Sequence, residues 1–168
     1  MKPTSHPSRR VVIGGLTALF CSGVKAAPVH LPPPGPRDTC PVCGMFVAPY
    51  RFWIATIGYA DGEPAHFDGA KDLFKYLTDM PRWAGGRKVT GIAGIGVTSY
   101  YDTRLIDAKD AVYVIGSDVL GPMGHELVPH ESQDDAEEFR RDHKGKRIVR
   151  LPDITPALLA ALDDGRFE

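Results

Sequence analysis

The sequence passes twice through one order of predicted secondary structure, strand, strand, helix, strand, although few residues match between its two halves. In the first half, residues 52–59 are aromatic and β-branched, Asp61-Gly62 is a hairpin signal, and residues 65–67 begin the returning strand. An extended segment at 97–101 supplies the third strand. The recurrence predicts a structural duplication.

The helix of the first half is expected to begin at Asp68, whose side chain would cap it. Apolar residues at helical spacing from Leu73 to Leu77 form one stripe, and the helix is expected to end before Pro81. The glycine-rich segment 85–96 that follows is expected to be a loop.

The second half has strand patterns at 111–115, 126–128 and 147–151, with a turn at Leu120–Gly124 between the first two. A helix is predicted from Ser132, its cap, to about His143. Acidic residues in its first turn and basic residues in its last turn suit the helix dipole.

These patterns predict an α+β fold of two sequential ββαβ units, followed by a C-terminal helix that opens at Thr155-Pro156. We place the first unit at residues 40–105 and the second at 106–168. Residues 27–39 are rich in proline and are expected to form an extended leader, so that the folded region would begin at the cysteines. About 140 residues suffice for one compact domain.

Residues 1–26 have the features of an export signal: a basic start with Arg9-Arg10, an apolar run at 11–20, and the small-residue cleavage site Val24-Lys25-Ala26. The run is too short to span a bilayer. Residues 8–13 also resemble part of a twin-arginine signal, which would export an already folded chain, with ordinary secretion as the alternative. Either route predicts a bacterial periplasmic protein.

Cys21 stands where a lipoprotein cysteine would stand, but Phe20 before it is larger than the residues that lipoprotein processing prefers. We therefore expect a soluble protein, with a lipid anchor as the alternative. The whole chain has 20 basic and 21 acidic residues, and cleavage after Ala26 leaves 16 basic ones. This balance argues against nucleic acid as a partner, because phosphate binding needs clustered Lys and Arg.

Cys40, Cys43 and Met45 place two thiols and a thioether within six residues. Thiolate and thioether donors together favour cuprous copper, whereas zinc sites seldom use methionine. In an extended segment, the side chains of Cys43 and Met45 would point the same way and could hold one ion. The motif therefore predicts a Cu(I) site with Cys40 beside it.

A third ligand is expected from the turn Gly121-Pro122-Met123-Gly124, because glycine and proline place Met123 outside a helix core. Cuprous copper accepts two or three ligands, so Met123 would complete a trigonal site. The alternative is that Met123 fills an apolar gap beneath a loop. His125 and His130 lie near this turn in the sequence and are candidate auxiliary ligands.

Two other interpretations of the cysteines stay open. Cys40-Pro41-Val42-Cys43 is a CxxC motif, which would make the chain a thiol-disulfide oxidoreductase acting on a metalloenzyme's cysteines. Such enzymes normally carry the motif after a strand and at a helix start, whereas here it follows the proline-rich leader. A four-ligand zinc site would need His125 and His130 as well.

At four places the chain resembles the NosL family, accessory proteins of nitrous oxide reductase. The matching segments are Cys43-Gly44-Met45, Phe67-Asp68-Gly69, residues 112–117 and Gly121-Pro122-Met123-Gly124. Their order and spacing fit over nearly all of the chain that follows the signal.

The resemblance implies paired ββαβ units and a periplasmic Cu(I) chaperone, not an enzyme. Such a chaperone would deliver copper for the copper centres of nitrous oxide reductase, together with the membrane assembly machinery of that enzyme. The resemblance also implies that Cys43, Met45 and Met123 are metal ligands, with Cys40 and His125 as weaker candidates. We expect a monomer in isolation, and a purely structural partner in an assembly complex is a third interpretation.

Overall fold

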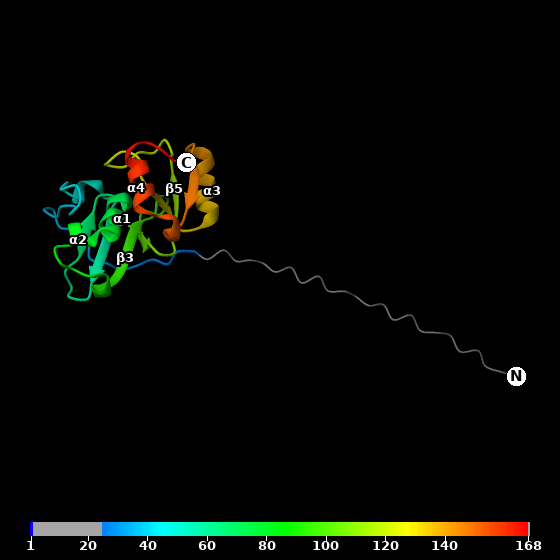
Figure 1. Cartoon of the computed structure of the whole chain (residues 1–168). Coiled ribbons are helices and arrows are strands. Elements are labelled where there is room, and N and C mark those ends of the chain that lie inside the picture. Colours follow the sequence, from blue (N-terminus) through cyan, green and yellow to red (C-terminus); the bar gives the residue numbers. More distant parts are fainter. Residues whose placement is uncertain (2–24, 168) are drawn as a thin grey trace.

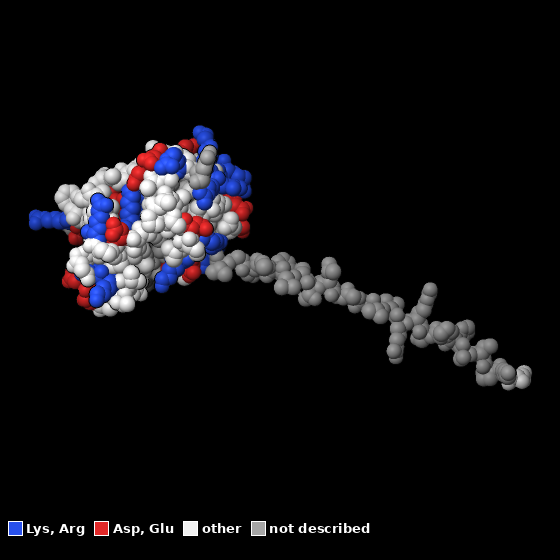
Figure 2. All heavy atoms as spheres, in the orientation of Figure 1, with Lys and Arg blue, Asp and Glu red and all other residues white. Residues whose placement is uncertain are grey.

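The computed structural model describes residues 25–167 and Met1. The predicted export signal, Cys21 included, therefore lies almost entirely outside the described residues. Among the residues that are described, no helix combines the length and the apolar character needed to cross a bilayer. On the face shown in Figure 2, basic and acidic side chains lie side by side over the folded part.

The folded part consists of two antiparallel sheets and the helices that cover them (Figure 1). The strands are β1 (Ala55–Tyr59), β2 (Ala65–Phe67), β3 (Ile92–Thr98), β4 (Leu105–Asp107), β5 (Val112–Ile115), β6 (Val128–His130) and β7 (Arg147–Val149). The helices are α1 (Ala70–Thr78), α2 (Met80–Trp83), α3 (Gln133–Asp142) and α4 (Pro156–Asp163), with short 3-10 turns η1 (Ala48–Tyr50), η2 (Val89–Gly91) and η3 (Leu151–Asp153). Helices α2 and α3 lie at opposite ends of the folded part (Figure 1).

The topology of the sheets confirms the predicted duplication. The strand order is β2-β1-β3-β4 in one sheet and β6-β5-β7 in the other. In each sheet the first strand of the unit is central, its hairpin partner lies on one side, and the strand after the helix lies antiparallel on the other. The edge strand β4, which extends the first sheet, was not anticipated.

The helix caps of the second unit are as predicted. The Ser132 hydroxyl accepts a hydrogen bond from the amide of Asp135 at 3.1 Å, and the Thr155 hydroxyl accepts one from Leu158 at 3.2 Å. Helix α4 then packs against α1, which brings the end of the chain back to the first unit. The rings of Phe74 on α1 and Tyr113 on β5 meet edge to face at 5.4 Å, so one core serves both units.

Several predicted boundaries are wrong. The segment 85–96 is not a loop throughout, because β3 already begins at Ile92. The first strand begins at Ala55 rather than at residue 52, and β6 spans Val128–His130 rather than 126–128. The end of the first helix is as predicted, because α1 stops at Thr78, before Pro81. Pro81 lies in the next short helix, α2, at a first-turn position that tolerates proline.

The proline-rich leader is part of the fold, so the expectation that the folded region begins at the cysteines is wrong. The carbonyl of Ala27 accepts a hydrogen bond from the amide of Asp107 at 2.9 Å, and the amide of Val29 donates to the carbonyl of Leu105 at 3.0 Å. The side chains of Val29 and Leu31 lie over Gly96, where no side chain stands in their way. The absence of side chains at the glycines of β3 therefore leaves space in which the leader packs on the sheet.

A larger side chain at Gly96 should lift the leader from the sheet. A Cβ at this position would stand 2.9 Å from Val29 and 3.2 Å from Leu31. We expect Gly96→Val to lower the free energy of unfolding by about 1–3 kcal/mol, as overpacking does. Urea unfolding and limited proteolysis of residues 27–36 would measure this. Ala93→Val, at an exposed position of the same strand, is the control, and equal protease resistance of the two variants would contradict the prediction.

His130 at the end of β6 is fully buried, and neither ring nitrogen has a hydrogen-bond partner among the described residues. Its ring packs among three aromatic side chains: Tyr100, Tyr101 and Phe139. Burial lowers the pKa of His130 to about 4; Asp135 opposes this effect and His143 adds to it slightly. The folded protein therefore holds a neutral imidazole here.

This burial predicts a loss of stability in acid. Between about pH 6.5 and 4 the unfolded chain binds a proton that folded His130 does not, which costs about 3 kcal/mol of stability over that range. We expect His130→Leu to flatten the fall in the free energy of unfolding between pH 7 and 4, measured by urea denaturation. The exposed His30, changed to leucine, is the control. An unchanged pH dependence in His130→Leu would contradict the prediction.

Candidate metal centre

The cysteines lie in a tight loop that a short bridge between Thr39 and Phe46 closes. Within it, the amide of Cys40 donates to the carbonyl of Met45 at 2.8 Å, and the amide of Gly44 donates to the carbonyl of Cys40 at 2.8 Å. Gly44 has φ +79°, a left-handed conformation that favours glycine. The segment is therefore not extended, and the expectation that alternation turns Cys43 and Met45 to one side does not apply.

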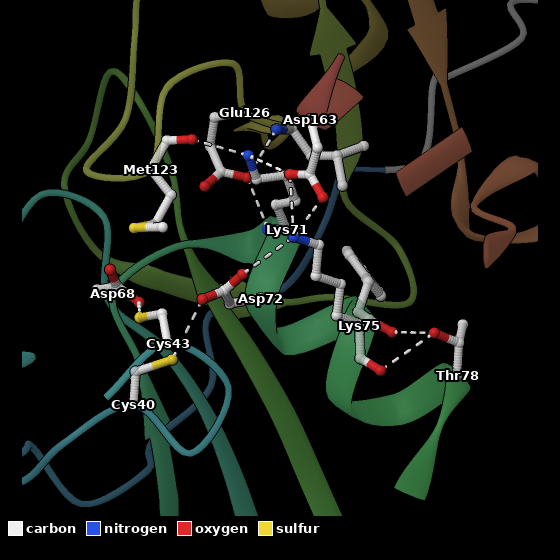
Figure 3. A network of polar contacts seen from close by, with 12 residues as sticks. Cys40, Cys43, Asp68, Lys71, Asp72, Lys75, Thr78, Met123, Glu126 and Asp163 are labelled. Carbon is white, nitrogen blue, oxygen red and sulfur yellow. Dashed lines mark hydrogen bonds and ion pairs between the residues drawn. The ribbon is translucent and has the colours of Figure 1, made fainter. Parts of the chain in front are cut away.

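Two carboxylates face the thiols of this loop (Figure 3). The Cys43 thiol donates to Asp68 Oδ1 at 3.3 Å, and the Cys40 thiol donates to Asp72 Oδ2 at 3.4 Å. One ligand atom from each of these four residues lies within 4.8 Å of all the others. The thiol–carboxylate cluster, as we call Cys40, Cys43, Asp68 and Asp72, is therefore compact enough for one ion to contact several of its members.

Asp68 is not the helix cap that the sequence suggested. The cap position of helix α1 is Gly69, which has no side chain to bond to the first turn. Asp68 is buried, and its Oδ2 has no hydrogen-bond partner among the described residues. Because an unpaired buried carboxylate oxygen is costly, this atom indicates a place for a cation.

Burial and the carboxylates keep both thiols protonated at neutral pH. The pKa of Cys43 is raised to about 11, chiefly by burial, with a contribution from Asp72 and Asp68 and against the opposing hydrogen bonds of Met45 and Cys40. The pKa of Cys40, which is only 1% exposed, is raised further still, again chiefly by burial. A thiol of this kind is a poor nucleophile. A soft cation, however, can replace the two protons and bind the sulfurs directly.

Met123 stands across a cleft from the cysteine loop. Its turn is closed by a hydrogen bond from the amide of Gly121 to the carbonyl of Gly124 at 2.8 Å, as the sequence predicted. Met123 and Cys43 both line a cleft of about 540 Å³ between the loop, α1, α2 and α4. The Met123 side chain is 45% exposed, so it does not fill a gap in the core.

The histidines do not join the cluster. The His125 ring packs on the ring of Phe167 at 4.7 Å, beside Gly165 at the end of α4. His130 is enclosed by aromatic rings under α3. The zinc site that would combine them with the two cysteines is therefore not formed. Met45 lies half-buried in the same loop, which it helps to close through its carbonyl.

Sequence reasoning missed Asp68 and Asp72 as members of this centre. Their spacing of four residues was the available signal, because it brings two carboxylates to one side where a strand turns into a helix. An acidic residue at a helix start is more simply explained as a cap, and only the position of the cysteine loop decides between the two roles.

The two thiols should differ in reactivity. Cys43 is partly exposed and Cys40 is buried, so iodoacetamide at pH 8 should modify Cys43 first and Cys40 only after unfolding. Because the pKa of each thiol is raised, Cys43 should also react more slowly than free cysteine. Mass spectrometry of tryptic peptides over time would measure both rates. Equal labelling of the two cysteines in the folded protein would contradict this geometry.

Comparison with known proteins finds similarity to the NosL family. The sequence model of the NosL family matches residues 33–159. The copper-binding lipoprotein NosL of Stutzerimonas stutzeri is 29% identical over 123 residues, which is 73% of this chain and 64% of that relative. The chain therefore spans less than two thirds of the length of that curated relative.

Two solved structures have related sequences or folds. The crystal structure of the copper chaperone NosL from Shewanella denitrificans aligns with a TM-score of 0.62 and 24% identity, over 76% of this chain and 97% of that one. This likeness shows that the fold is shared. The solution structure of apo-NosL from Achromobacter cycloclastes aligns with a TM-score of 0.42 and 28% identity, over 62% of this chain and 87% of that one.

Proposed function

The chain belongs to the NosL family, and from this premise we propose that it carries cuprous copper. The relatives named above are a copper-binding lipoprotein and a copper chaperone. In the function we propose, the chain binds one Cu(I) ion in the periplasm and delivers it for the copper centres of nitrous oxide reductase. It acts as a carrier and catalyses no reaction.

The observation that supports this function best is the convergence of Cys40 and Cys43 on one point beside Asp68 and Asp72. A metal–thiolate bond is about 2.3 Å long in zinc sites, so one ion bridges two sulfurs up to about 4.6 Å apart. The two sulfurs here lie within 4.8 Å of each other, and a small adjustment suffices. Thiolate donors favour the cuprous over the cupric ion.

Met123 supplies the third soft donor in this proposal. Its thioether lies on the opposite wall of the cleft that Cys43 lines, and Figure 3 shows its sulfur on the side of Cys43 and Asp68. Two thiolates and one thioether make a low-coordinate site, which leaves room for a donor from the recipient. Copper can then pass by exchange of ligands, without a free ion.

The geometry gives less support to a thiol-disulfide oxidoreductase. The CxxC segment forms a closed loop and does not begin a helix, so no helix dipole stabilises a thiolate. The carboxylates of Asp68 and Asp72 also disfavour the thiolate anion that such an enzyme needs.

Anaerobic titration of the reduced protein with Cu(I) against a chromophoric chelator tests the proposal. We expect one equivalent to bind and both Cys43→Ser and Cys40→Ser to lose most of the affinity. Met123→Ala should weaken binding less, because a two-coordinate site survives. Met45→Ala tests the remaining predicted ligand.

Asp79→Asn is the matched control, because Asp79 lines the same cleft but is not part of the thiol–carboxylate cluster. Its affinity should equal that of the wild type. Failure of the wild type to compete with the chelator, or full affinity in both cysteine variants, would rule out the carrier as described. Transfer of bound copper to metal-free nitrous oxide reductase, followed after separation of the two proteins, then tests the recipient.

A further inference from the structure

We propose that Lys71 and Glu126 are positioning residues for copper binding: together they fix the Met123 turn against the start of α1. This inference rests on the proposed function, because it assigns a role toward the thioether of Met123. The two residues come from different ββαβ units, and each reaches into the segment that carries the other.

The first connection runs from helix α1 to the turn. Lys71 is only 1% exposed, and its ammonium donates to the main-chain carbonyl of Met123 at 2.9 Å. The same ammonium pairs with Asp163 Oδ1 at 3.0 Å on α4 (Figure 3). Lys71 therefore ties the Met123 turn to two of the helices that border the cleft.

The second connection runs in the opposite direction. Glu126, three residues after Met123, is buried, and its Oε1 accepts hydrogen bonds from the amide of Lys71 at 2.6 Å and from that of Leu127 at 2.9 Å. The first amides of a helix lack partners within the helix, and Glu126 Oε1 accepts from one of them. Glu126 thus takes the place of the cap that Gly69 does not provide.

Gly69 makes room for this carboxylate. A Cβ at this position would overlap Glu126 Oε2, and no rotation of an alanine side chain would avoid the clash. The φ of Gly69, −168°, is an extended conformation that any residue adopts, so the backbone does not require glycine here. The requirement for glycine in Phe67-Asp68-Gly69 comes from the approach of Glu126.

The turn has little else to hold it in place. None of residues 121–125 is fully buried, and apart from the Gly121–Gly124 bridge the contact of His125 with Phe167 is the packing described for this turn. Burying Lys71 and Glu126 is costly, and apolar residues at such positions would often give equal or greater stability. Lys71 and Glu126 are therefore better explained by a role in fixing the position of Met123, as residues behind the ligands of metal sites commonly do.

A double-mutant cycle on Cu(I) affinity tests the inference. Lys71→Met should lower the affinity about 10-fold, the lower end of the range for supporting residues of metal sites. In the Met123→Ala background the same substitution should cause no further loss, because the group that Lys71 positions is absent. The methyl resonance of Met123 should also shift less on addition of Cu(I) in Lys71→Met than in the wild type.

Lys75→Met is the matched control. Lys75 also pairs with Asp163, at 2.7 Å, and lies 3.7 Å from Asp72, but the structure shows no bond from it to the Met123 turn. Lys75→Met removes the same charge near the cluster. We expect its effect on Cu(I) affinity to be small, and equal in the wild-type and Met123→Ala backgrounds. Gly69→Ala, which displaces Glu126 without removing a charge, is the second variant if Lys71→Met does not fold.

The possible outcomes separate the two proposals. An equal loss from Lys71→Met in both backgrounds, or no loss in the wild-type background, would overturn the positioning role and leave the copper carrier standing. Failure of the wild type to bind Cu(I) would overturn the proposed function, and the positioning role with it.

Discussion

The hydrogen bond between the Glu126 carboxyl group and the first turn of α1 joins the two ββαβ units, and the candidate metal centre depends on that junction. The cysteine loop and both carboxylates of the cluster belong to the first unit, whereas Met123 belongs to the second. The edge-to-face pair of Phe74 and Tyr113 holds the same two units together by apolar packing. A site with donors from both units therefore exists only when the whole chain is folded.

Charged and polar groups are concentrated at the start of α1, where burial makes them expensive. Asp68, Lys71 and Asp72 are all buried within five residues of one another. Most of the remaining fold follows ordinary rules, with side-chain caps at Ser132 and Thr155 and apolar central strands. The buried His130, whose ring nitrogens have no partner among the described residues, is an exception. Conflict between stability and local chemistry is typical of a functional site, and at the start of α1 it coincides with the thiol–carboxylate cluster.

The sequence predicted those features whose cause is local. The hairpin at Asp61-Gly62, the caps at Ser132 and Thr155 and the turn around Met123 all follow from a few neighbouring residues. The duplicated topology followed from the order of these elements, which the sheets confirm.

Features that depend on distant segments were not predictable in this way. The strand through Gly96 pairs with β1 and β4 and is covered by Val29 and Leu31, and Asp68 faces the thiols because the cysteine loop packs there. His125 is close to Met123 in sequence, but its ring packs on Phe167 and does not line the cleft. Short sequence distance therefore does not bring His125 to the cysteines, while two carboxylates more than twenty residues from the cysteines in sequence lie beside them.

The donors differ steeply in their access to solvent: Cys40 is 1% exposed, Cys43 is partly exposed, and Met123 is 45% exposed. For the carrier proposed here, this gradient sets the order in which the ligands of the copper ion are exchanged. An arriving donor meets the thioether first, then the sulfur of Cys43, and reaches Cys40 last. Until that final exchange the ion stays attached to the chain through its innermost sulfur, so departure is stepwise.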